Sequence, residues 1–201
     1  MTYLKIAVAA AAAAVLGFTA TTHAQQEKST QQSNSAKQGK SAQVAKQDRQ
    51  ALERLAQSDM AEIAAGKLAA ERASSPEVKK FGQHMVEEHS KMLEEGKKIA
   101  ESKGVKPPAN TDKKHQAALK KLQGLEGEAF DKQFMAQMVK DHEDALKLAE
   151  KAAKDAKDPE VKAHAEKGAP HIKEHLAQAR KLNDSLGASA GSSGTRSRSS
   201  K

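Results

Sequence analysis

The sequence predicts an all-α protein, a four-helix bundle with a short extra helix in the connection between the second and third long helices. Three observations support this fold: four long segments of helical composition, apolar residues at helical spacing within them, and Ser, Pro and Gly signals at their boundaries. No segment has the alternating pattern of a strand. Amphipathic helices of similar length bury their apolar faces against one another, so a bundle is the expected arrangement.

The expected helix boundaries follow from capping residues and prolines. The long helices are predicted over residues 48–73, 76–103, 129–156 and 159–184, and the short helix over about 112–123. Ser75 is a suitable N-cap for the second helix, Pro76 suits its first position, and Gly104 ends it. Pro159 opens the fourth helix in the same way. Because proline lacks a backbone N–H, we expect Pro170 to break the fourth helix.

Apolar residues in the second helix indicate which face it buries. They recur every seven residues, at Val78, Met85, Met92 and Ile99. Such a narrow stripe suits helix packing in a bundle. Two stretches also repeat along the chain: residues 76–79 recur at 159–162, and residues 81–89 resemble residues 134–142. Shared packing requirements or duplication of a helical hairpin could each produce these repeats.

The first 24 residues have the pattern of a secretory signal peptide. Lys5 precedes an apolar run from Ile6 to about Ala20, and small residues end at Ala24, where we expect cleavage. The apolar run is mostly alanine and is shorter than the roughly 20 residues that a membrane-spanning helix needs. We therefore expect an exported protein, located in the periplasm or associated with the outer membrane.

Composition predicts disorder on both sides of one folded domain. Residues 25–45 and 186–201 are rich in Ser, Gln, Gly and Lys and offer little apolar surface to bury. We expect the first to be a disordered linker and the second a disordered basic tail. The bundle is predicted over residues 46–185.

The charge distribution and the missing side-chain types exclude several functions. The formal net charge is +8, but Lys5, residues 25–45 and the tail from residue 185 carry six of these charges. The helical region is therefore nearly balanced. This argues against specific nucleic-acid binding and leaves only loose contact of the basic tails with an anionic envelope surface. The chain has no cysteine, which excludes thiolate metal sites, disulfides and cysteine nucleophiles.

Three histidines near the middle of three predicted helices form the candidate site. Each directly follows an acidic residue, in the pairs Glu88-His89, Asp141-His142 and Glu174-His175. Glu62 lies near the middle of the first helix, and at a rise of about 1.5 Å per residue all four positions share one layer of the bundle. Imidazoles from three helices and a carboxylate from the fourth suit a transition metal. We expect Glu62 and the three histidines to bind the ion and the three preceding acids to orient the ligands.

Two methionines bear on which metal such a site would hold. Met85 and Met138 each lie four residues before a histidine and therefore on its helix face. As alternate ligands they would favour copper. Without them, the ligand types suit copper, zinc or iron, so the predicted cofactor is one transition-metal ion or none.

Other interpretations of these residues stay open. A buried acid–histidine layer can be a metal-free network that fixes helix register in a structural or interaction protein of the envelope, and methionines at helical spacing are usually core residues. His171, Glu174 and His175 match the H-x-x-E-H pattern of inverted zinc peptidases, but that site needs a third ligand from a larger fold. No nucleophile or oxyanion hole is evident, so we expect that the protein is not an enzyme.

A series of motifs in the helical region carries a family resemblance. In order, the motifs are Glu62-Ile63, Val78-Lys79-Lys80-Phe81, Met85, Glu88-His89, Gly127, Phe130-Asp131, His142, Pro170 and His175. Over about residues 48–184 this order is similar to the domain-of-unknown-function 4142 family, exported bacterial proteins often labelled as outer-membrane proteins. The resemblance implies a ferritin-like four-helix fold and an envelope location, and it implies no established activity.

The sequence departs from the pattern of di-iron ferritins. Their sites use Glu-x-x-His motifs from two helices. In this chain Val86, Val139 and Ile172 stand three residues before the three candidate histidines. A site for one metal ion, or none, therefore fits these residues better than a di-iron centre.

Overall fold

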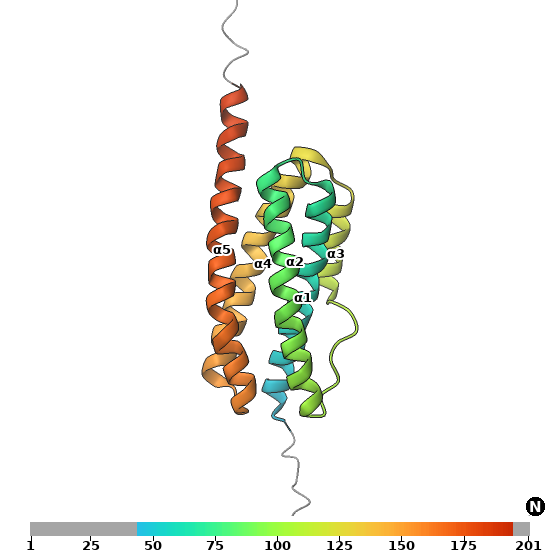
Figure 1. Ribbon diagram of the computed structural model, residues 1–201, viewed down its shortest axis with the longest axis vertical. Coiled ribbons are helices and arrows are strands. Elements are labelled where there is room, and N and C mark those ends of the chain that lie inside the picture. The colour runs from blue at the N-terminus through green and yellow to red at the C-terminus, as the bar shows by residue number, and fades with distance from the viewer. Residues whose placement is uncertain (1–43, 195–201) are drawn as a thin grey trace, which may run out of the picture. The chain divides into compact units, whose positions relative to one another are not determined.

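The computed structural model describes residues 44–194, which form five helices and no strand (Figure 1). The helices are α1 (Lys46–Arg72), α2 (Pro76–Ser102), α3 (Lys113–Gln123), α4 (Gly127–Asp155) and α5 (Pro159–Gly194). The predicted all-α bundle with a short extra helix is confirmed. The predicted signal peptide over 1–24, the linker up to residue 43 and the tail from residue 195 lie outside the described residues.

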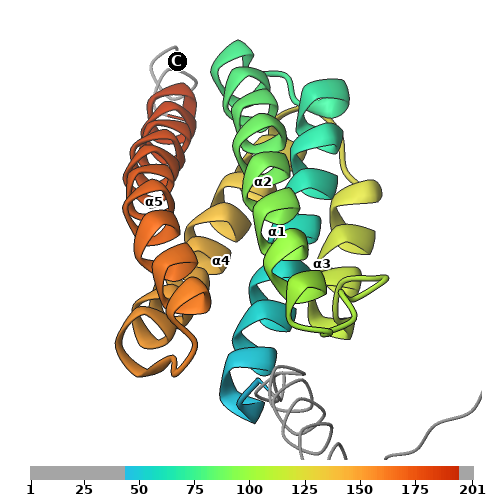
Figure 2. The same cartoon turned by 60° about the horizontal axis from the view of Figure 1, so that its bottom comes forward.

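The four long helices form two antiparallel hairpins, α1–α2 and α4–α5. α1 also packs against α4, α2 packs against α5, and α3 lies along α1. α3 carries the chain back along the bundle, so that α2 and α4 run in the same direction (Figures 1 and 2). A single long crossover of this kind is the connectivity of ferritin-like bundles.

The N-terminal signals of α2 and α5 act as the sequence predicts. The Ser75 hydroxyl accepts a hydrogen bond from the Val78 N–H, and the Asp158 carboxylate accepts one from the Glu160 N–H at 2.9 Å. Each helix then has proline at its first position, where an N–H would have no partner within the helix. These caps allow each hairpin to turn within a few residues.

The prediction that Pro170 breaks the fourth helix is wrong. α5 passes through Pro170 without interruption. The proline is exposed, and it removes one backbone hydrogen bond from the helix. Ile172 and Leu176 follow directly and are buried in the bundle. Their packing maintains the helix on both sides of the proline.

The helix end predicted near Asp184 is also wrong. α5 continues to Gly194, so residues 186–194 of the predicted disordered tail are helical. Leu182 and Leu186 are partly buried against the apolar core and extend the stripe that begins with Ala179. This continued packing explains why α5 extends beyond Asp184.

The buried face of α2 follows an 11-residue repeat, and the predicted seven-residue repeat is wrong. Its buried residues are Val78, Phe81, Gly82, Met85, His89, Leu93, Gly96 and Ala100. Met92 and Ile99, which the seven-residue repeat includes, are only partly buried. An α-helix has about 3.6 residues per turn, so a seven-residue repeat drifts around a straight helix, whereas an 11-residue repeat stays nearly in line. The same drift brings His89 to the buried face.

Three apolar clusters fill the bundle. The cluster near the α1–α2 turn contains Phe81, Phe130 and Phe134, and Phe134 packs against both other rings. The next cluster along the bundle contains Leu55, and the cluster at the far end contains Leu52. Between the first two clusters lie buried polar residues from all four long helices, which we call the polar layer: Asp59, Glu62, His89, His142 and His175.

Two buried aspartates tie the hairpins together at opposite ends. Asp48, in the first turn of α1, accepts hydrogen bonds of 2.8–3.1 Å from the N–H groups of residues 157–158 in the α4–α5 turn. Asp131, in the first turns of α4, accepts bonds of 2.6–3.1 Å from the N–H groups of residues 74–75 and the Ser74 hydroxyl in the α1–α2 turn. The first helix of each hairpin therefore caps the turn of the other hairpin.

These contacts distinguish the two sequence repeats. Asp48 and Asp131 are 83 residues apart, and so are the repeated segments 76–79 and 159–162. This repeat relates one hairpin to the other and fits a duplicated hairpin. The similarity of residues 81–89 to residues 134–142 instead relates α2 to α4. Shared packing explains it, because these helices run in the same direction and both place a histidine in the polar layer.

Gly82→Ala is expected to destabilise the bundle, because α1 and α2 approach closely at Gly66 and Gly82. A Cβ added at Gly82 would lie 2.6 Å from the Ala69 Cβ and 2.8 Å from the Gly66 carbonyl oxygen. Overpacking of this kind costs about 1–3 kcal/mol. Thermal unfolding measures the loss, with Gly187→Ala on α5 as the control, since nothing lies within 4 Å of a Cβ there. Equal melting temperatures for the two variants would contradict the close approach.

Candidate metal centre

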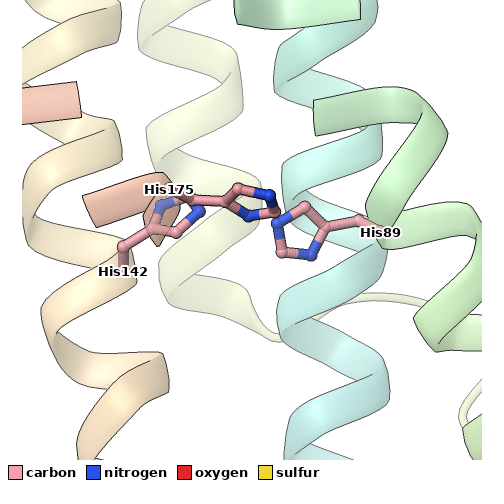
Figure 3. A group of neighbouring side chains, drawn as sticks. All are labelled: His89, His142 and His175. Atoms are coloured by element: carbon pink, nitrogen blue, oxygen red, sulfur yellow. The ribbon is translucent and has the colours of Figure 1, made fainter. Parts of the chain in front are cut away.

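Three histidines from three helices meet in the polar layer (Figure 3). His89 comes from α2, His142 from α4 and His175 from α5, and each is at most 2% exposed. Their ring centroids are 5.3–5.5 Å apart. One ligand nitrogen of each ring lies within 4.8 Å of the corresponding nitrogens of the other two. The structure therefore brings together the three histidines that the sequence singled out.

Hydrogen bonds orient two of these rings from behind. The His142 Nδ1–H donates to the Met138 carbonyl oxygen at 2.9 Å, which leaves a lone pair on Nε2. The His89 Nδ1 lies 2.9 Å from Oδ1 of Asp59 on α1, and in the neutral tautomer whose Nδ1–H donates to that carboxylate the lone pair is on Nε2. Histidines that bind a metal through one ring nitrogen generally donate a hydrogen bond from the other, as these two rings do.

The remaining nitrogens of these rings are buried without partners. His89 Nε2, His142 Nε2 and His175 Nδ1 make no hydrogen bond to any of residues 44–194. Leaving a buried polar atom unsatisfied costs about 1–3 kcal/mol. Three such atoms, one on each of three rings that can offer ligand nitrogens within 4.8 Å of one another, indicate a site suited to an ion that accepts lone pairs from imidazoles.

Burial keeps the His142 and His175 imidazoles in the neutral form that can bind a metal. Loss of hydration, followed by the nearby His89, lowers the pKa of His142 to about 3. Burial, followed by the neighbouring histidines, lowers the pKa of His175 to about 2. At neutral pH both rings are therefore uncharged, and no proton has to leave them before they bind a cation.

Glu62 lies in the polar layer but beside the histidine group. Its Oε1 is 3.7 Å from His142 Nδ1, and neither carboxyl oxygen has a hydrogen-bond partner among the described residues. Burial, together with the negative charges of Asp141 and Asp59, raises the pKa of Glu62 well above its usual value. The group of ligand atoms within 4.8 Å contains only the histidines. Glu62 is thus a neighbour that the sequence placed correctly in the layer.

The three acids that precede the histidines form hydrogen bonds with other side chains, whereas the sequence predicted that they orient the histidines. Glu88 accepts a hydrogen bond from Lys91, Asp141 accepts one from Gln137, and Glu174 accepts one from Gln178. Adjacent residues on a helix point about 100° apart, so a residue next to a buried ligand faces another direction. The expected orienting role of these acids is therefore not supported.

Asp59 takes one of these orienting roles, and the sequence reasoning missed it. It is buried, and burial raises its pKa, while the hydrogen bond with His89 opposes this shift. Its helical spacing could have identified it, because Asp59 lies four residues after Leu55 and three before Glu62, and therefore on the buried face of α1. A charged residue at such a position needs a buried partner.

The two methionines pack as core residues. Met85 and Met138 are fully buried in the apolar cluster that contains Phe81 and Phe134. Met138 takes part in the site through its backbone carbonyl, which holds the His142 ring. Their position supports the interpretation of these side chains as core filler.

The peptidase-like motif does not converge on one site. His175 is buried in the polar layer, whereas His171 and Glu174 are exposed. The H-x-x-E-H spacing in α5 therefore arises from one buried residue of the polar layer and two residues at the surface.

None of the described helices is long and apolar enough to cross a membrane.

The chain is similar in structure to a solved protein of low sequence identity. A DUF305 fragment from Deinococcus radiodurans has 18% identity and a TM-score of 0.62, and the match covers 72% of this chain and 98% of the fragment. At this identity the likeness shows the fold alone. No curated protein matches the sequence.

A family comparison identifies the group to which the chain is related. The protein-family model described as Domain of unknown function (DUF4142) matches residues 33–182. This segment includes α1 to α4, most of α5 and the whole polar layer. The resemblance expected from the motifs is confirmed, and the protein belongs to the DUF4142 family.

Proposed function

We propose that the protein is an exported, ferritin-like bundle that binds one divalent transition-metal ion through His89, His142 and His175. The observation that carries this proposal is a group of three buried histidines from three helices, each with an unpartnered nitrogen, that can offer ligand atoms within 4.8 Å of one another. In tetrahedral coordination with bonds of about 2.0–2.1 Å, ligand nitrogens stand roughly 3.4 Å apart. A small inward movement of the rings would bring the group from its present spacing to this value.

The ligand set favours copper or zinc. Three imidazole ligands suit both Cu²⁺ and Zn²⁺, and for a given site of this kind Cu²⁺ binds more tightly. Iron is less favoured, since bundle iron sites combine histidines with several carboxylates. The expected location in the envelope depends on the signal-like pattern of residues 1–24.

A second candidate is a metal-free envelope protein in which the polar layer fixes helix register. The hydrogen bonds from His89 to Asp59 and from His142 to the Met138 carbonyl support it, because they connect buried polar groups without any ion. This alternative leaves the three inner nitrogens without partners.

Metal titration of the full chain, purified without an affinity tag, tests the proposal. We expect one Zn²⁺ or Cu²⁺ per chain by elemental analysis and calorimetry, and a higher melting temperature with metal. Binding to the folded state alone stabilises it by about 4 kcal/mol at a free metal concentration 1,000 times Kd. If neither metal binds stoichiometrically and the melting temperature stays constant, the register-fixing alternative holds.

A further inference from the structure

We propose that metal ions reach the buried histidines through the seam between α2 and α5, where Glu88 and His171 form an outer binding site. This inference rests on the proposed function. It concerns how the ion enters and leaves the centre, and it assigns a role to surface residues that the centre itself does not use.

Ligand-type side chains face each other in pairs along this seam. α2 and α5 pack side by side. His84 and His175 have ring centroids 5.2 Å apart, and one turn further along, Glu88 Oε2 lies 3.9 Å from His171 Nδ1. The seam therefore offers nitrogen and oxygen ligands at successive turns, beginning at the exposed His171 and ending at His175 in the polar layer.

A pocket opens on the outer part of the seam. It has a volume of about 180 Å³, and its lining includes Glu88, Met92, His164 and His171. Glycine leaves room for the larger side chains: a Cβ at Gly96 would lie 3.2 Å from His164 Nε2. The pocket thus presents carboxylate, thioether and imidazole groups, all of which bind transition metals.

The spacing of Glu88 and His171 suits one bridging ion. Two ligands of a tetrahedral metal stand roughly 3.4 Å apart, close to the 3.9 Å between Glu88 Oε2 and His171 Nδ1. From this site the next step inward passes the half-buried His84, whose ring touches His175. His175 in turn contacts both other histidines of the centre.

The polar pocket on the other side of the bundle is less suited to a cation. It lies among α1, α3 and α4, has a volume of about 420 Å³ and is lined by three lysines and an arginine together with three aspartates. Within it, the Lys114 Nζ forms an ion pair with Asp144 Oδ2 at 2.7 Å and lies 3.9 Å from Asp141 Oδ1. The four cations of this pocket repel an incoming divalent ion. In the α2–α5 pocket Lys167 is paired with Glu95, and Lys91 donates to Oε1 of Glu88, so Oε2 is the Glu88 oxygen that faces His171.

Rapid mixing of the metal-free full chain with Zn²⁺ in the presence of a fluorescent zinc indicator tests the route. We expect Glu88→Gln and His171→Ala each to slow Zn²⁺ uptake by about tenfold. Release into excess chelator should slow by the same factor, because a route affects both directions equally and leaves Kd unchanged. His115→Ala and Asp144→Asn, which change a histidine and an acid of the opposite pocket, should leave both rates as in the unaltered protein.

Each other result counts against the route. Unchanged rates in Glu88→Gln and His171→Ala, or slow uptake in the His115 and Asp144 variants, would overturn it while the proposed function stands. Faster release with a weaker Kd would also overturn it, since these residues would then hold the ion at equilibrium. If the unaltered protein takes up no Zn²⁺, the route for Zn²⁺ is overturned, and the proposed function fails as well only if Cu²⁺ does not bind either. Matching melting temperatures of the metal-free variants establish that all of them fold.

Discussion

Replacing His142 by alanine is expected to abolish the stabilisation of the bundle by metal. The His142 side chain supplies one of three inner nitrogens, and the remaining pair cannot complete a three-histidine site. In the unaltered protein, a free metal concentration 1,000 times Kd should raise the stability by about 4 kcal/mol. For a domain of this size the melting temperature then rises by about 10 °C. In His142→Ala, scans with and without Zn²⁺ or Cu²⁺ should coincide.

His115→Ala is the matched control for this experiment. His115 is half-buried and lies 3.0 Å from an Asp112 oxygen, but it is outside the polar layer. This variant should keep the full rise in melting temperature with metal. If His142→Ala instead costs about 1–3 kcal/mol equally with and without metal, the polar layer is a structural network and the metal proposal is wrong.

The sequence predicted the fold well where local signals determine it. The caps at Ser75 and Asp158 set the hairpin turns, and the apolar stripes set the bundle. It failed where tertiary packing overrides a local signal. Pro170 does not break α5 because Ile172 and Leu176 are buried beyond it, and Leu186 extends the helix into the predicted tail.

The site could be predicted in part for a similar reason. Counting residues along each helix placed His89, His142 and His175 in one layer, because axial position depends only on the rise per residue. Rotation about the helix axis is harder to predict, since a small error in the repeat changes which neighbour faces inward. The orienting role was therefore assigned to Glu88, whereas Asp59 on another helix holds the His89 ring.

The polar layer also bears on how the two hairpins stay docked. Asp48 and Asp131 tie each hairpin to the turn of the other at the two ends of the bundle. In the middle, His89 belongs to the first hairpin, whereas His142 and His175 belong to the second. An ion bound by all three would join the hairpins at this third point. Metal binding should therefore stabilise the docking of the hairpins more than the hairpins themselves.

Glu62→Gln is expected to change how stability depends on pH in metal-free protein. The pKa of Glu62 is raised in the folded state, chiefly by burial, from an ordinary value of 4.5. Below pH 4.5 both states hold the proton, and the contribution of Glu62 to stability is fully present. As the pH rises towards the folded-state pKa, only the unfolded chain loses the proton, so this contribution falls by about 1.4 kcal/mol per pH unit. Glutamine cannot titrate and should escape this loss.

The measurement is the difference in unfolding free energy between Glu62→Gln and the unaltered protein from pH 4 to pH 8, by denaturant titration with a chelator present. The difference should be constant below about pH 4.5 and then grow in favour of glutamine, by about 1.4 kcal/mol per pH unit, until the pH reaches the raised pKa of Glu62 in the folded protein. Glu174→Gln, at an exposed carboxylate on α5, controls for the loss of one acid. A difference that does not vary with pH would mean that Glu62 is ionised in the folded protein.

The same variant decides whether Glu62 takes part in metal binding. Glutamine keeps the shape of the side chain but is a poorer metal ligand than a carboxylate. If three histidines hold the ion alone, Glu62→Gln should bind Zn²⁺ with the Kd of the unaltered protein. If the carboxylate moves from beside His142 to complete the coordination, Kd should weaken by at least tenfold, and metal binding should release one more proton from the unaltered protein than from the variant. Calorimetry in buffers of different ionisation enthalpy counts that proton directly.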